Sequence, residues 1–170
     1  MNNIQKLVSA ALLMAVGVLL PIVFHSVGGM AVGTLLLPMH LPILIAGALL
    51  GWEYGLLCAI ITPLVSFMTT GMPMLAKLPY MMAELICYGI IIALLYKKTN
   101  KLLLSLLAAQ LIGRAVYALL LFGTALLFNW QNVSAIITVW TAFITGLPGI
   151  VLQWVLVPLV ISAIKRERCL

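Results

Sequence analysis

The chain has 170 residues, of which 65% are hydrophobic and 7% are charged, and its formal net charge is +6. No soluble domain of this length needs so much apolar surface, so the composition excludes a soluble globular protein. It predicts a single all-α integral membrane domain over residues 1–170. The positive charge indicates orientation in a membrane and gives no sign of nucleic-acid binding.

Apolar runs and the breaks between them predict six transmembrane helices. Their expected positions are about 5–24, 35–50, 54–70, 79–96, 102–128 and 134–164. A glycine-containing loop over 25–34 is expected after the first helix. In the second helix, Pro38 and Pro42 also allow a broken or re-entrant segment. In the sixth, Pro148 and Pro158 are expected to cause kinks, because each removes a helical hydrogen bond.

The basic residues predict the topology. Seven of the nine lie in three regions, namely Lys6, the cluster over 97–101 and the segment over 165–168. The positive-inside rule assigns all three regions to the cytoplasm, and six helices satisfy that assignment. Both termini are therefore expected in the cytoplasm. The loops expected on the outer side are 25–34, 69–78 and 129–133.

Two charged residues lie deep in the apolar segments. Glu84 is fourteen positions before Lys98, and Arg114 is thirteen positions after Lys101. Both are then about 20 Å from the cytoplasmic end of their helices. In an apolar core about 30 Å thick, that depth is beyond the middle. A charge there is unfavourable unless it is paired or hydrated, so the pair indicates either a functional site or a structural salt bridge.

Other polar and aromatic residues are expected at a similar depth. Tyr88 shares a helix face with Glu84, and Gln110 and Tyr117 share a face with Arg114. An apolar concavity with a few convergent polar groups is typical of a small-molecule site. The expected substrate-binding residues are Glu84, Arg114, Tyr88, Gln110, Tyr117, Gln153, His40, Met72 and Lys77. A packing role stays open, since methionines fill membrane cores and glutamines form bonds between helices.

Cysteine and histidine patterns add no further chemistry. Cys58, Cys87 and Cys169 form an odd and scattered set, and His25 and His40 lack a helical HxxxH or HExxH spacing. The sequence therefore predicts neither a disulfide framework nor a metal site, and it predicts no cofactor.

Four motifs, taken in their order, resemble those of a transporter family. They are ALLMA at 11–15, LPMHLPILIAGALLG at 37–51, TGMPM at 70–74 and MAELICYG at 82–89. Together with six short helices in about 170 residues, they resemble the substrate-binding S components of energy-coupling factor (ECF) vitamin transporters. The resemblance covers nearly the whole chain.

The resemblance implies a subunit of the prokaryotic plasma membrane that captures a vitamin or related micronutrient from outside. It also implies a transmembrane coupling subunit and two cytoplasmic ATPases as partners, and this chain has no GxxxxGK[ST] phosphate loop of its own. Ala11 and Ala15 match the family's motif for docking the coupling subunit. The loops expected over 25–34 and 69–78 match the segments that cover the ligand.

The residues leave the ligand and two other function classes open. A neutral Glu84–Arg114 pair favours a cobalamin-like or pyridoxine-like ligand, while Lys77 keeps pantothenate in view. A stand-alone secondary or proton-coupled transporter would use Glu84 as its titrating group. An intramembrane enzyme would use His40 and Glu84 as acid and base, but no nucleophile, metal set or second carboxylate accompanies them.

Overall fold

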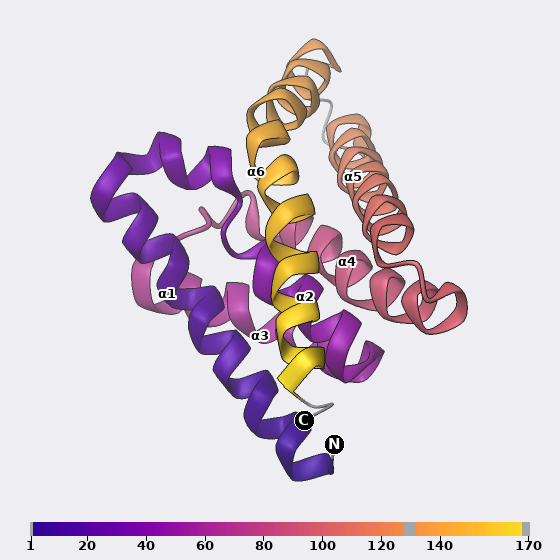
Figure 1. Cartoon of the computed structure of the whole chain (residues 1–170). Coiled ribbons are helices and arrows are strands. Elements are labelled where there is room, and N and C mark those ends of the chain that lie inside the picture. The colour runs from indigo at the N-terminus through magenta and orange to yellow at the C-terminus, as the bar shows by residue number, and fades with distance from the viewer. Residues whose placement is uncertain (1, 128–131, 168–170) are drawn as a thin grey trace.

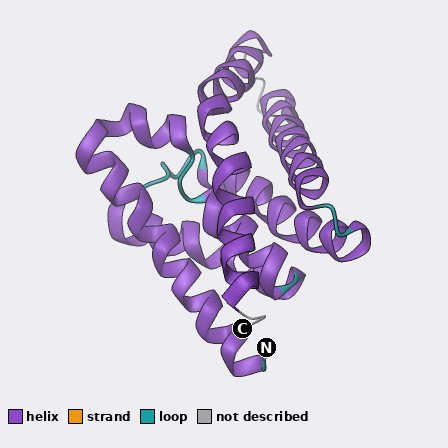
Figure 2. Ribbon diagram, viewed as in Figure 1, coloured by secondary structure: helices purple, strands orange, loops and turns teal. Residues whose placement is uncertain are grey.

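The computed structural model describes residues 2–127 and 132–167 and folds this part of the chain into six α-helices (Figure 1). The helices are α1 (Asn3–Leu36), α2 (His40–Leu50), α3 (Trp52–Thr70), α4 (Leu78–Thr99), α5 (Leu102–Leu127) and α6 (Asn132–Glu167). The described residues contain helices and loops and no strand (Figure 2). The all-α prediction is therefore confirmed. The turn expected at 129–133 falls largely on residues 128–131, outside the described part.

Five of the described helices are long and apolar enough to cross a membrane, and α2 is the exception. With 11 residues, α2 is about 16 Å long, roughly half of the apolar core of a bilayer. The structure thus contains the expected number of helices. By length and composition, it supports five complete spans and one short buried helix.

The loop expected over 25–34 is helical, so that prediction was wrong. Helix α1 continues through this stretch to Leu36, and its only non-helical backbone angles are at Gly29, where φ is 68°. Glycine adopts a positive φ without a steric penalty, so the chain bends there and resumes the helix. The second helix begins only at His40, because Leu37 ends α1 in the left-handed conformation and Pro38 follows it.

The other boundaries lie close to those expected. The loop between α3 and α4 covers 71–77, within the predicted 69–78. Helix α4 extends further than predicted, because Lys97 and Lys98 form part of its last turn and only Asn100 and Lys101 break the chain. Cations are favourable near a helix C-terminus, which explains why the lysines do not end the helix. Helix α6 contains both Pro148 and Pro158, and Figure 1 shows a bend in its upper half.

Helix α2 forms the centre of the bundle. It packs against α1, α3, α4 and α6, and nine of its eleven residues are buried. One apolar cluster joins it to α4, α5 and α6, and a second joins it to α1, α3 and α4. A helix too short to span a membrane is tolerated within the apolar layer when protein surrounds it, as it surrounds α2.

Three glycines bring the backbones of α2, α3 and α4 into direct contact. A Cβ atom on Gly47 would lie 2.4 Å from the carbonyl oxygen of Gly89, and a Cβ on Gly55 would lie 2.7 Å from the same oxygen. A Cβ on Gly89 would lie 2.6 Å from the carbonyl oxygen of Gly55. Any larger residue would force these helices apart. We call this arrangement the glycine contact.

Basic residues near the ends of α4 and α6 lie together at one end of the bundle. The Lys165 ammonium lies 4.8 Å from the centre of the Tyr96 ring and donates a hydrogen bond to the Tyr96 hydroxyl. The C-terminal part of α6 therefore lies beside the end of α4, where Lys97 and Lys98 are located. Figure 1 shows the start of α1 and the end of α6 at the same end of the bundle.

Candidate functional site

A cavity of about 440 Å³ opens among α1, the start of α2, the end of α3, the α3–α4 loop, α4, α5 and α6. Its apolar lining consists of Pro21, Leu37, Pro38, Met39, Met72, Pro73, Met74, Met81 and Ala142. Its polar lining consists of His25, His40, Ser66, Lys77, Glu84, Arg114, Tyr117, Thr141 and Thr145. A mostly apolar concavity with a few polar groups is the usual form of a small-molecule site.

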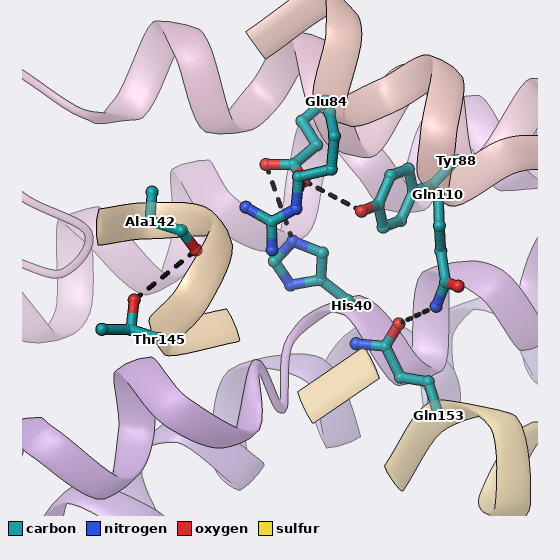
Figure 3. Close-up of polar contacts among 8 residues, drawn as sticks. His40, Glu84, Tyr88, Gln110, Ala142, Thr145 and Gln153 are labelled. Atoms are coloured by element: carbon teal, nitrogen blue, oxygen red, sulfur yellow. Dashed lines mark hydrogen bonds and ion pairs between the residues drawn. The ribbon is translucent and has the colours of Figure 1, made fainter. Parts of the chain in front are cut away.

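The buried floor of the cavity is organised around Glu84. The Arg114 Nε atom lies 3.1 Å from Oε1 of Glu84, and the Tyr88 hydroxyl donates a 2.9 Å hydrogen bond to the same oxygen. The His40 Nε2 atom lies 4.0 Å from Oε2 (Figure 3). Glu84 is only 3% exposed, so its charge needs these neighbours. The two charges that the sequence places at matched depth are thus in contact.

The local sequence explains how these side chains meet. Glu84 and Tyr88 are four residues apart on α4 and therefore lie on one face. Gly113 lets α5 approach that face, because a Cβ there would lie 2.2 Å from the Tyr88 ring. Gly146 on α6 makes room for the guanidinium, because a Cβ there would lie 2.6 Å from Nη2 of Arg114. Arg114 is therefore held between the Glu84 carboxylate and the backbone of α6.

Several buried polar atoms in the cavity lining make no hydrogen bond within the described structure. They are both ring nitrogens of His40, the Ser66 hydroxyl, and Nε and Nη2 of Arg114, although Nε has the Glu84 carboxylate as its ion-pair neighbour. Buried polar groups in folded proteins are nearly always bonded, and exceptions often mark functional positions. These atoms have almost no accessible surface, so the three side chains meet the cavity through their other atoms.

Six of the nine expected site residues line the cavity. They are His40, Met72, Lys77, Glu84, Arg114 and Tyr117. Tyr88 stands behind them, 1% exposed, where it bonds Glu84 and packs edge-on against the His40 ring. Tyr88 therefore contacts Glu84 and His40 from behind and supports their positions.

The remaining two, Gln110 and Gln153, lie outside the cavity lining and face each other. The Gln110 Nε2 atom donates a 2.8 Å hydrogen bond to Oε1 of Gln153 (Figure 3). The Trp154 indole donates a 2.7 Å bond to Oε1 of Gln110. These bonds join α5 to α6, which matches the packing alternative for the two glutamines.

Four polar residues of the lining were not among the expected site residues: His25, Ser66, Thr141 and Thr145. The two threonines are four apart on α6, and this spacing in an apolar helix was a usable signal for a shared face. His25 was assigned to a loop, whereas the structure places it on α1 just before the bend, with Nδ1 3.3 Å from the Gly29 carbonyl oxygen.

The expected docking residues Ala11 and Ala15 are exposed on α1. Large apolar side chains surround them on this outer surface of the helix, including Leu7, Leu12 and Val16. The described residues contain no group of three or more histidine, cysteine, aspartate or glutamate side chains arranged to hold a metal ion.

A protein-family model matches this chain over most of its length. The model of the family described as "ECF transporter, substrate-specific component" matches residues 5–161. Comparison with curated proteins and with solved structures gave no match. The family match includes every helix that lines the cavity and most of the chain. The chain therefore belongs to the family of substrate-specific components of ECF transporters.

Proposed function

We propose that this chain captures a water-soluble vitamin or related micronutrient in the cavity and delivers it to an ECF importer. Family membership supports the transporter class, and the single observation that supports capture is the cavity with the Glu84–Arg114 pair at its floor. Its volume of about 440 Å³ lies within the range of roughly 300–1,000 Å³ that is typical of small-molecule sites. ATP hydrolysis would belong to two partner subunits, joined through a transmembrane coupling subunit.

The cavity volume favours a compact ligand. A substituted single ring or a short branched chain, such as pyridoxine or pantothenate, fits this space. The corrin ring of a cobalamin with its nucleotide arm is several times larger. Of the ligands that the sequence left open, the smaller ones are therefore favoured.

Arg114 is proposed as a direct ligand contact. Its side chain is 13% exposed and lines the cavity, while its Nε and Nη2 atoms are buried against Glu84 and Gly146. The rest of the guanidinium faces the cavity and is therefore available to a ligand. Glu84 would fix its orientation, so that the ordering of the long side chain is complete before the ligand arrives.

The proposed orientation puts the cavity at the outer side of the membrane. Lys77 marks the cavity end of α4, and Lys97 and Lys98 lie in the last turn of the same helix. The positive-inside rule then assigns the lysine end to the cytoplasm and leaves the cavity open to the outside. The exposed face around Ala11 and Ala15 is proposed as the docking surface for the coupling subunit.

Native mass spectrometry of the gently purified protein tests capture directly. We expect the purified protein to retain one small molecule. The affinity of this molecule for the ligand-free Arg114→Ala variant should be at least about tenfold lower than for the wild type, equivalent to about 1.4 kcal/mol. Gly123→Ala is the matched control, because nothing lies within 4 Å of a Cβ at that position. Unchanged affinity in a folded Arg114→Ala variant would refute the contact.

Uptake assays separate the importer from a stand-alone carrier. Ala11→Trp and Ala15→Trp should abolish assembly or uptake while the isolated chain keeps its ligand affinity, because both side chains lie on the exposed surface of α1. Uptake that continues without the partner subunits or ATP would instead support a secondary transporter.

A further inference from the structure

We propose that the ligand is a compact monoanion whose negative group binds Lys77 and whose neutral hydrogen-bonding groups lie at the floor of the cavity. This inference rests on the proposed capture function and specifies its substrate class. The feature that carries it is the uneven distribution of charge along the cavity wall.

The described cavity lining carries one uncompensated positive charge. Its three fully charged side chains are Lys77, Glu84 and Arg114. Glu84 and Arg114 neutralise each other at 3.1 Å. Lys77 forms no ion pair with any described side chain, and both ion pairs of the described structure involve Glu84. An anion at Lys77 would therefore complement the charge of the site.

The positive charge and the neutral floor are at different depths. Lys77 immediately precedes the first residue of α4, and Glu84 follows it by seven residues. This separation corresponds to about 10 Å along the helix axis. The cavity wall also contains Met39, Met72 and Met81, which offer adaptable apolar contacts. A ligand bound in this way would have one charged end and a less polar body.

The floor favours neutral groups over a second negative charge. Its accessible polar group is the outer part of the Arg114 guanidinium, whose charge Glu84 already neutralises, and a hydroxyl, carbonyl or ring nitrogen would accept a hydrogen bond from it. A second carboxylate or a phosphate would find no further uncompensated cation in the described lining, because Glu84 already neutralises Arg114, and it would stay unpaired in a mostly apolar cavity. The single uncompensated charge of Lys77 thus favours a ligand with one negative charge over a dianion.

Matched pairs of small molecules test this inference. Each pair has one skeleton with and without a carboxylate: pantothenate and pantothenol, 4-pyridoxate and pyridoxine, and nicotinate and nicotinamide. Binding to the purified full chain is measured by calorimetry at low and high salt. For the pair that fits the cavity, we expect the acid to bind at least about tenfold more tightly, with a preference that weakens as salt rises.

Variants of Lys77 assign that preference to one side chain. Lys77→Gln should remove it and leave the affinity of the neutral member nearly unchanged, whereas Lys77→Arg should retain it. Lys97→Gln at the opposite end of α4 is the control and should behave as the wild type. Equal binding of both members of every pair that binds, or a preference that survives in Lys77→Gln, would overturn the inference.

The retained molecule separates this inference from the proposed function. A neutral compound or a dianion identified by native mass spectrometry would overturn the monoanion and leave capture intact. If no compound is retained and no probe binds the wild type, capture itself fails, and the inference fails with it. A retained monoanion whose affinity falls in Lys77→Gln supports both.

Discussion

The same three helices form two very different regions of this molecule. At one end of α2, α3 and α4, the side chains of His40, Ser66 and Glu84 line the cavity. Away from the cavity, the glycine contact brings the three backbones together without intervening side chains. His40 and Gly47 are only seven positions apart on α2, or about 10 Å. Tight packing and an open polar cavity are therefore close neighbours.

The difference shows how a chain with few charges can keep a cavity in a membrane. Where the backbones touch, van der Waals contact holds the helices, and no polar group needs a partner. Where they separate, Glu84 pairs with Arg114, and the ring nitrogens of His40 and the Ser66 hydroxyl make no hydrogen bond within the described structure. Because the three backbones already touch at the glycine contact, α2, α3 and α4 cannot move closer together there.

The largest expected effect comes from breaking the ion pair at the cavity floor. Glu84→Ala leaves Arg114 buried without its counter-charge, which typically reduces the free energy of unfolding by about 3–5 kcal/mol. Thermal unfolding in detergent measures the loss. The double variant Glu84→Leu with Arg114→Met should recover much of that stability but not ligand binding. A single variant as stable as the wild type would show that the pair is not buried as described.

A smaller loss is expected at the glycine contact. Gly89→Ala puts a Cβ 2.6 Å from the backbone oxygen of Gly55, which cannot rotate away. Overpacking of this kind typically destabilises a protein by about 1–3 kcal/mol. Gly123→Ala, whose Cβ meets no atom within 4 Å, should be harmless. If the two variants have the same midpoint of unfolding, the three backbones are not in contact.

Loss of the Gln110 hydrogen bonds should matter less. Gln110→Leu removes the bonds to Gln153 and Trp154, and bonds between membrane helices are worth about 1 kcal/mol. Because Gln110 lies outside the cavity lining, ligand affinity should stay within about twofold of the wild type. A strong loss of affinity with unchanged stability would instead return Gln110 to the binding site.

The smallest effect is expected at the basic end of the bundle. Lys165→Gln removes a contact between an exposed ammonium and the ring and hydroxyl of Tyr96. Exposed interactions of this kind contribute less than about 1 kcal/mol. A change of several degrees in the unfolding midpoint would show that the end of α6 has a larger structural role.

The placement of the residues at the cavity floor could be predicted in part from the sequence. Counting from the lysines predicted the matched depth of Glu84 and Arg114, because helical rise converts residue number into distance. The four-residue spacing likewise predicted that Tyr88 would lie beside Glu84. Both predictions needed only the geometry of one helix and the thickness of a membrane.

Contacts between separate helices could not be predicted from the sequence, because they depend on three-dimensional packing. The glycine contact joins three separate helices, and no spacing within one helix reveals it. The rotation of α5 and α6 about their axes decides whether Gln110 faces the cavity or Gln153, and packing sets that rotation. The stretch after Phe24 looked like a loop because of its glycines, yet one positive φ at Gly29 was enough to accommodate the bend.

The most direct test fills the cavity and measures what the protein retains. Ala142 lines the cavity from α6, so Ala142→Trp should occupy much of the space. The prediction is that this variant folds, as judged by its unfolding midpoint, but carries no small molecule in native mass spectrometry, while Gly123→Ala retains it. A folded Ala142→Trp protein that keeps the ligand at wild-type occupancy would contradict capture in this cavity.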